Sequence, residues 1–239
     1  QAIGPFTVGA RVLQIQAGTD FSAARYRTAE SGAVNERRFG ADMVTRIGLT
    51  ERFEMSFGLA YLNDRMRSDS LNALTNGISA FSVRIRSNVL VGKGLIPTVG
   101  FQFNLGLPAV SQDYRAAQVA PKLTIMTGQR LGKRFGFTTN SGVVWTGNSE
   151  IPIGFYIFNL GSDIADFMFT FIEHYADMGK NSWNGSMDGG FGFLVNRDLQ
   201  LDVLGGYGPF HVHDDWFVSV GVSWRTRFNK KTKGQGNEQ

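Results

Sequence analysis

The residues with the clearest capacity for chemistry form one short cluster, His211-Val212-His213-Asp214-Asp215. Two histidines that are two residues apart on a strand point to the same side, and with a carboxylate they could bind a metal ion or serve a hydrolase. No second pair of aspartates and no serine motif of matching character accompanies the cluster, and the chain contains no cysteine for thiol chemistry or disulfides. We therefore interpret the cluster as a polar loop and expect no enzyme activity, no metal and no cofactor.

The positive charges do not form a surface for nucleic acid, although the formal net charge is +4 at pH 7. Arginines are scattered over polar stretches, and the last lysines belong to residues 229–239, which contain no apolar residue. Aromatic residues alternate with apolar positions rather than with basic ones, unlike the stacking surfaces of nucleic-acid-binding proteins. We expect one domain, residues 1–228, followed by a polar, disordered tail at 229–239, and no nucleic-acid partner.

The dominant pattern is an alternation of apolar and polar residues at period two. In the last segment one face is apolar and the other consists largely of small residues and arginines, which suits lipid on one side and a narrow wet interior on the other. The apolar face comprises Trp216, Val218, Val220, Val222, Trp224, Thr226 and Phe228, and the other face comprises Phe217, Ser219, Gly221, Ser223, Arg225 and Arg227. Thirty glycines against six prolines also fit many strands better than long helices.

Extending this pattern along the chain predicts about twelve strands. Their ranges are 11–26, 35–49, 52–63, 79–92, 97–107, 119–130, 134–146, 151–160, 166–176, 184–196, 199–209 and 215–228. The connectors alternate between short ones and longer polar ones around 27–34, 64–78, 108–118 and 177–183. Bacterial barrels have short periplasmic turns and longer outer loops. The sequence thus predicts an all-β, transmembrane, antiparallel up-and-down β-barrel in the outer membrane of a Gram-negative bacterium, with both termini periplasmic.

Two further features concern the ends of the expected barrel. The chain starts at Gln1 without methionine, so we expect that a signal peptide has been removed. Near the other end, Trp224 and Phe228 resemble the terminal aromatic signal by which barrel-assembly machinery recognises its substrates; the alternative is an ordinary aromatic anchor at the interface. The expected partners are therefore outer-membrane lipid and, during biogenesis, the assembly machinery.

One segment, residues 151–172, is apolar on both faces. We expect its turn near Gly161-Ser162-Asp163. Such a hairpin could line an apolar lumen, bind an apolar ligand or pack against another outer-membrane protein. The residues that would do so are Ile151, Ile153, Phe155, Phe167, Phe169 and Phe171.

The carboxyl half resembles a known family. Its motifs are Phe171-Ile172-Glu173-His174-Tyr175, the run from Gly189 to Val195, Leu199-Gln200-Leu201-Asp202, and Val220 to Phe228. They are similar to those of the outer-membrane β-barrel family named after the MetA pathway of phenol degradation, whose members are generally described as transporters. The resemblance implies fold and location, and it carries no catalytic or ligand set to this chain.

The polar face of the expected strands predicts a charged lumen. Its members are Asp42, Arg46, Glu54, Arg84, Arg86, Gln102, Asn104, Lys122, Asp188, Asp202, Arg225 and Arg227. Charges in a confined interior must be paired or hydrated, so mutual neutralisation is favoured over a selectivity filter. We expect a pair between Asp202 and Arg225, and partners for Arg84 and Arg86 among Asp42, Asp188 and Asp202.

Two functions remain open at this point. The leading hypothesis is a channel or transporter for small molecules, apolar ones among them. The alternative is a non-conducting structural or accessory subunit of a larger outer-membrane complex, because twelve strands enclose little space once large side chains point inward.

Overall fold

Twelve strands make up almost all of the computed structural model, which describes residues 2–28, 32–68, 70, 72–94, 96–208 and 214–228. The strands are β1 (Val12–Thr28), β2 (Gly32–Gly48), β3 (Phe53–Arg67), β4 (Asn72–Leu90), β5 (Thr98–Leu107), β6 (Ala120–Leu131), β7 (Phe135–Val144), β8 (Ile153–Ala165), β9 (Met168–Met178), β10 (Trp183–Leu194), β11 (Leu199–Tyr207) and β12 (Asp214–Arg227). One 3₁₀ helix, η1 (Gln112–Tyr114), lies between β5 and β6. No helix among the described residues is long and apolar enough to span a membrane.

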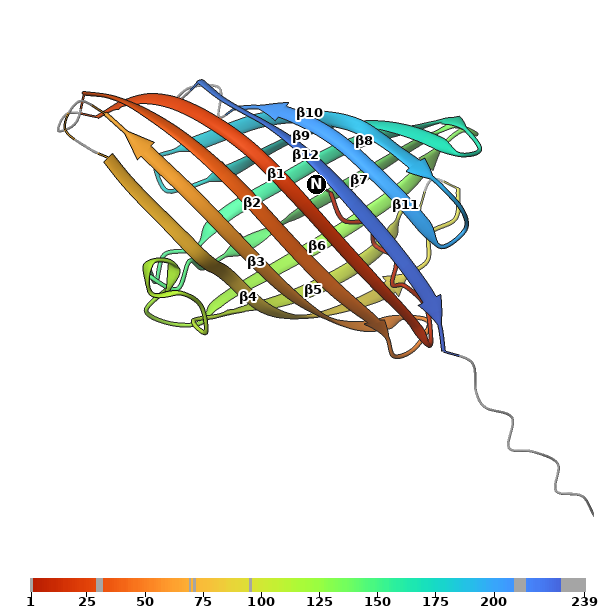
Figure 1. Ribbon diagram of the computed structural model, residues 1–239. Helices are drawn as coiled ribbons and strands as arrows, with labels where there is room; N and C mark the ends of the chain where they lie inside the picture. The colour runs from red at the N-terminus through yellow and green to blue at the C-terminus, as the bar shows by residue number, and fades with distance from the viewer. Residues whose placement is uncertain are drawn as a thin grey trace, which may run out of the picture.

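The strands form a closed barrel in which each strand pairs with its chain neighbours (Figure 1). The first and last strands close it, because β1 pairs antiparallel with β12 from Val12↔Arg227 to Arg25↔Asp214. Over the middle of the barrel each strand therefore pairs on both sides, which is what a sheet in hydrocarbon requires. The prediction of an all-β up-and-down barrel of twelve strands is confirmed.

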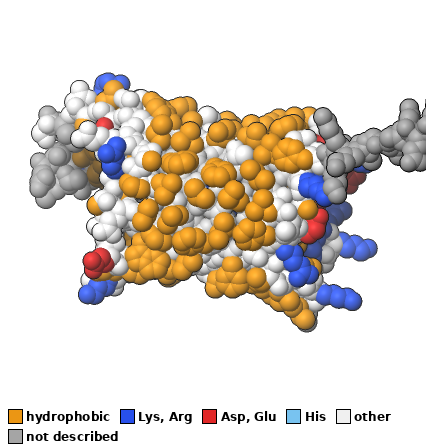
Figure 2. All heavy atoms as spheres, turned by 90° about the horizontal axis from the view of Figure 1, so that it is seen from below, with side chains coloured by type: hydrophobic (Ala, Val, Ile, Leu, Met, Phe, Trp, Pro, Cys, Tyr) orange, Lys and Arg blue, Asp and Glu red, His pale blue; other side chains and the backbone are white. Residues whose placement is uncertain are grey.

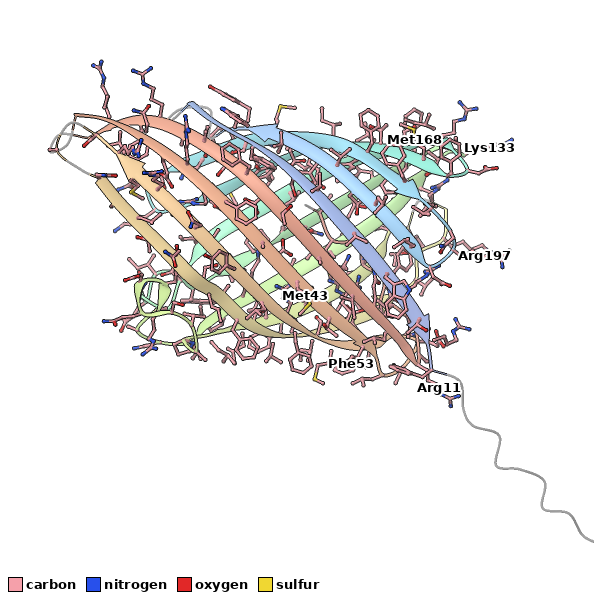
Figure 3. The ribbon with its side chains drawn as sticks, in the orientation of Figure 1. Arg11, Met43, Phe53, Lys133, Met168 and Arg197 are labelled. Carbon is pink, nitrogen blue, oxygen red and sulfur yellow. The ribbon has the colours of Figure 1, made fainter. Side chains whose placement is uncertain are left out.

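The outer face is a belt of exposed apolar side chains. Val218, Val220 and Trp224 of β12 are 51%, 55% and 44% exposed, and the same alternation continues around the barrel. Figure 2 shows this apolar surface on one face of the barrel, with charged side chains gathered toward the two ends, and Met43 lies in the middle of the barrel in Figure 3. An apolar surface of this extent is stable in lipid and would associate in water.

The two ends of the barrel differ in their connections. We call the end with residues 132–134, 166–167 and 195–198 the turn end, and the end with residues 108–119 and 145–152 the loop end. Arg11, Lys133 and Arg197 lie at the turn end (Figure 3).

The expectation of longer loops at 27–34 and 64–78 is wrong for most of their length, whereas residues 179–182 of the expected loop at 177–183 do connect β9 and β10. Strand β1 continues to Thr28 and β2 begins at Gly32. Strand β3 continues to Arg67 and β4 begins at Asn72. The hairpin ladders continue with polar side chains beyond the apolar belt, so the hydrophobic alternation ends before the strands do.

The hairpin of β8 and β9 also turns at a different place from the one expected. Gly161, Ser162 and Asp163 are strand residues of β8, and the turn lies at 166–167. Gly161 pairs with Phe171, and the Asp163 carboxylate lies 3.0 Å from Nη2 of Arg130 on β6. Glycine and aspartate, which are common in turns, thus lie within a strand here. The Asp163 carboxylate is paired with the Arg130 guanidinium.

Candidate channel lumen and the segment inside it

The register places the expected lumen residues on the inward positions of their strands. These are Asp42 and Arg46 on β2, Glu54 on β3, Arg84 and Arg86 on β4, Gln102 and Asn104 on β5, Lys122 on β6, Asp188 on β10, Asp202 on β11, and Arg225 and Arg227 on β12. Several of them are buried, and Glu54 is fully inaccessible to solvent. Other polar groups of the interior were not in the predicted set, notably Asn88, Asn140 and Glu173.

Residues 2–9 lie inside the barrel, and we call them the inner segment. Figure 1 marks the N-terminus within the barrel outline, and hydrogen bonds join the segment to the inner wall at several levels. This segment could not be predicted from the sequence, because residues 2–9 show no period-two pattern.

The far end of the inner segment is held by an amide and a carboxylate. Ile3 N donates to Oδ1 of Asn140 at 2.7 Å, and Nδ2 of Asn140 donates back to Ile3 O at 2.8 Å. Ala2 N donates to Oε1 of Glu173 at 2.7 Å, and the same oxygen accepts from Nδ2 of Asn159 at 2.8 Å. Asn140 is 1% exposed, so its amide serves the segment's backbone as a neighbouring strand would.

The middle of the inner segment needs two glycines. Pro5 O accepts from Nδ2 of Asn88 at 3.2 Å, and Pro5 is fully buried. A Cβ atom on Gly100 would lie 2.7 Å from Pro5 O, and one on Gly128 would lie 2.9 Å from the proline ring. The wall is therefore shaped for close approach of the segment.

A charged cluster holds the near end. Glu54 accepts from Nε and Nη2 of Arg46, both at 2.9 Å, and from Val8 N at 2.8 Å. Nε of Arg86 lies 3.6 Å from the same carboxylate, and Arg86 also donates to Oε1 of Gln102 at 2.7 and 3.1 Å. The expected partners of Arg86, namely Asp42, Asp188 or Asp202, are thus wrong, because Glu54 lies on the adjacent strand β3 at the position paired with Arg86.

The expected pair between Asp202 and Arg225 does not form either. Asp202 accepts from Nε2 of Gln200 at 2.8 Å, whereas Arg225 donates to Arg197 O at 2.7 Å and lies 3.5 Å from the Asp198 carboxylate. The reason is the register, which places Asp202 opposite Gly221 and lets Arg225 reach the turn between β10 and β11.

Arg84 has a different environment. Its Nε donates to Oγ of Ser82 at 3.2 Å, and Nη2 lies 2.6 Å from the place where a Cβ on Gly58 would be. No carboxylate of the described residues lies within 4.0 Å of its nitrogens, so its expected pairing with Asp42, Asp188 or Asp202 is wrong at contact distance; Asp42 acts on it only at longer range.

A cavity of about 430 Å³ separates the inner segment from the wall formed by the first strands. Its lining includes the side chains of Arg46, Arg84, Arg86 and Arg225 together with Gln14 and Gln16. Ile3 and Val8 of the inner segment also line it. The cavity therefore joins cationic groups to apolar ones.

The apolar hairpin contributes to both faces of the barrel. Phe155 is buried, and Ile153, Phe169 and Phe171 also take inward positions. Ile151 and Phe167 lie in connections and are 60% and 59% exposed. Nζ of Lys122 lies 4.0 Å from the centre of the Phe155 ring, a cation–π geometry. The interior is thus partly apolar along β8 and β9.

The remaining candidate residues are the cluster at 211–215 and the aromatic residues near the end of β12. His211, Val212 and His213 lie outside the described residues, as does the tail at 229–239. Within the described part of the chain no group of three or more histidine, aspartate or glutamate residues is placed to bind a metal ion. Trp224 and Phe228 are exposed at outward positions, and Phe228 N donates to Arg11 O at 2.8 Å.

Comparisons with known proteins agree on the fold. No family model matches the sequence, and no curated protein matches it, so the resemblance to the phenol-degradation family stays a prediction. Among solved structures, an outer-membrane channel from Pseudomonas putida F1 is similar with a TM-score of 0.68 at 10% identity, over 93% of this chain and 98% of the channel.

Two other similar structures have different roles. The translocator domain of the autotransporter NalP from Neisseria meningitidis has a TM-score of 0.61 at 14% identity, over 92% of this chain and 90% of that domain. The KdgM porin, solved in complex with disordered oligogalacturonate, has a TM-score of 0.56 at 8% identity, over 89% of this chain and 99% of the porin. The chain therefore has the fold of transmembrane β-barrels, a fold that does not by itself select one function.

Proposed function

We propose that this protein is an outer-membrane channel for small molecules, apolar ones among them, whose lumen is closed by the inner segment. The observation that carries the proposal is the way in which the segment is held. Polar groups of the wall bind its backbone at Ile3, Pro5 and Val8, and it has no strand partner of its own. Water can replace such hydrogen bonds when the segment leaves, whereas a mainly apolar core would not tolerate that exchange.

The entry of the inner segment into the barrel has the geometry of a hinge. Gly9 has a φ of 89° and Arg11 a φ of 59°, and Arg11 N donates to Gly48 O at 2.9 Å. A positive φ at a non-glycine residue costs free energy, so the reversal of the chain at 9–11 is a place where a different backbone conformation would relieve strain. The segment can leave the lumen by rotation at this point without changing the strands.

The interior surface supports solutes with an apolar part. Ile153 of β8 and Phe169 and Phe171 of β9 take inward positions and are only partly buried. Apolar walls interrupted by a few polar groups are typical of small-molecule sites. The outer-membrane channel from P. putida and the KdgM porin share the fold and agree with a channel, although the likeness itself shows only the fold.

The orientation follows from the same proposal. Short turns face the periplasm in bacterial barrels, so the turn end would be periplasmic. The start of β1 and the end of β12 lie at this end and would be periplasmic too. The inner segment would then close the lumen from the periplasmic side.

The second candidate, a non-conducting accessory subunit, draws on the same contacts. If the inner segment never leaves, the cluster of Glu54, Arg46 and Arg86 around Val8 and Phe6 is simply part of a closed interior.

Permeation through liposomes separates the two functions. Full-length protein reconstituted in liposomes should admit small solutes that cross lipid slowly, measured by osmotic swelling, faster than liposomes that carry the heat-denatured chain. Equal rates for all solutes would contradict the channel and favour the accessory subunit.

A further inference from the structure

We infer that the cavity beside the inner segment is a binding site for a small organic carboxylate with an apolar body. This inference names the substrate class of the proposed channel and rests on that proposed function. The cavity measures about 430 Å³, within the range of small-molecule sites, and it lies between the inner segment and the inner wall.

The lining of the cavity favours an anion. Four guanidinium groups reach it, from Arg46, Arg84, Arg86 and Arg225, and no aspartate or glutamate of the described residues lines it. The carboxylates of the opposite wall, Glu173 on β9 and Asp188 on β10, do not take part in the lining. A cation in this cavity would meet guanidinium, amide, hydroxyl and apolar groups and no carboxylate in the described lining, since Asp42 and Glu54 act only from outside it.

Three of the four arginines already have partners. Glu54 accepts from Arg46 at 2.9 Å and lies 3.6 Å from Arg86, and it is fully buried behind them. Arg225 donates to Arg197 O at the turn end of the barrel. These groups create a positive potential in the cavity, but their own hydrogen bonds are largely formed.

Arg84 is the group that would hold the ligand. Among the described residues, the Ser82 hydroxyl accepts a hydrogen bond from its side chain, and no carboxylate of those residues lies within 4.0 Å of it. Because Gly58 has no side chain, the guanidinium lies across that residue, with Nη2 2.6 Å from the position of the missing Cβ. A guanidinium binds a carboxylate through two parallel N–H donors, so a planar organic acid uses this group better than a spherical anion does.

The rest of the lining suits an apolar body next to that carboxylate. Val44 of β2 and Ile3 and Val8 of the inner segment contribute apolar surface, while Gln14 and Gln16 offer amide groups. An acid bound here would contact both the wall and the inner segment. Its chemistry would be that of an aromatic or short aliphatic monocarboxylate.

Isothermal titration calorimetry of benzoate with the full-length barrel in detergent tests the inference. Benzamide serves as the uncharged isostere and inorganic phosphate as a simple anion. We expect benzoate to bind at least tenfold more tightly than benzamide. Arg84→Gln should weaken benzoate binding five- to tenfold and leave benzamide binding unchanged. Arg84→Lys should give an intermediate benzoate affinity, because it keeps the charge and loses the two parallel N–H donors of the guanidinium.

Lys122→Gln is the matched control. It also removes one inward positive charge, but Lys122 lies on β6 over Phe155 and does not line the cavity. Benzoate binding within twofold of the unaltered protein is expected for this variant, and the heat-dependent gel shift of each variant verifies that the barrel is folded.

The outcomes separate this inference from the proposed channel. Equal binding of benzoate and benzamide, or an unchanged benzoate affinity in folded Arg84→Gln, would overturn the site, as would phosphate that competes as well as benzoate does. If benzoate binds as expected but liposomes show no permeation, the carboxylate site stands and the channel fails. If liposomes are permeable and benzoate does not bind, the channel stands and the site fails.

Discussion

Replacing Glu54 by glutamine tests how the inner segment is held. Glu54 is fully buried and accepts hydrogen bonds from Arg46 and from Val8 N, with Arg86 at 3.6 Å. Glutamine has nearly the same shape but no charge, and one of its two terminal groups is a donor that would face guanidinium groups. The variant thus weakens the hydrogen bond from Val8 N to residue 54 without opening a cavity.

The magnitude of the effect has two parts. Removal of one partner from a buried ion pair costs about 3 to 5 kcal/mol of barrel stability, because Arg46 and Arg86 are left without their counter-charge. The hydrogen bond from Val8 N to a charged acceptor contributes about 1.5 to 3 kcal/mol to the closed position. A loss of about 2 kcal/mol from the closed state raises the ratio of open to closed channels roughly 30-fold.

Single-channel recording in planar bilayers measures this ratio as open probability. Asp163→Asn is the control, because its pair with Arg130 lies at the rim, with side chains 54% and 61% exposed, and such pairs contribute about 0 to 1 kcal/mol. The control should leave open probability unchanged. A folded Glu54→Gln barrel with the open probability of the unaltered protein would refute the assignment of Glu54 as the group that holds the segment.

Three further predictions concern the wall, the orientation and assembly. Gly100→Ala should raise open probability, because its Cβ would lie 2.7 Å from Pro5 O, whereas Gly136→Ala has no atom closer than 4.0 Å and should have no effect; equal behaviour would contradict the fit of the segment. A single cysteine at Ser149, in a chain that has none, should react with a membrane-impermeant thiol reagent on intact cells and one at Asn196 should not; the reverse pattern would invert the orientation. Phe228→Ala should lower the amount of folded barrel in the outer membrane at unchanged synthesis, and an unchanged folded yield would reduce Phe228 to a lipid-facing side chain.

The outer face could be predicted from the sequence because one physical rule governs it. A strand that meets lipid on one side must repeat at period two, and segments such as 216–228 follow this repeat closely enough to give the strand number and the closed topology. The same rule places polar residues such as Arg84 and Glu54 on inward positions. It does not describe strand ends outside the belt, and this is why the polar ends of β1 to β4 were expected to be loops.

The partners inside the lumen could not be predicted, because they depend on register and on contacts across several strands. A shift of one pair decides whether Arg225 meets Asp202 or the turn at Arg197, and Glu54 meets both Arg46 and Arg86 only because it lies between them on β3. The inner segment left only an indirect sign in the sequence. Asn140 and Glu173 are polar residues at inward positions that need buried partners, and those partners are the backbone of Ile3 and Ala2.

The most direct test of the central claim is the conductance of a barrel without its inner segment. Removal of residues 1–8 leaves every strand intact and takes away the groups bound by Asn140, Asn88 and Glu54. We predict that single-channel conductance in planar bilayers rises and that brief closures of the full-length protein disappear, while the heat-dependent gel shift of the barrel is retained. A folded, shortened barrel with the same conductance and the same closures as the full-length protein would contradict the claim that residues 2–9 close the lumen.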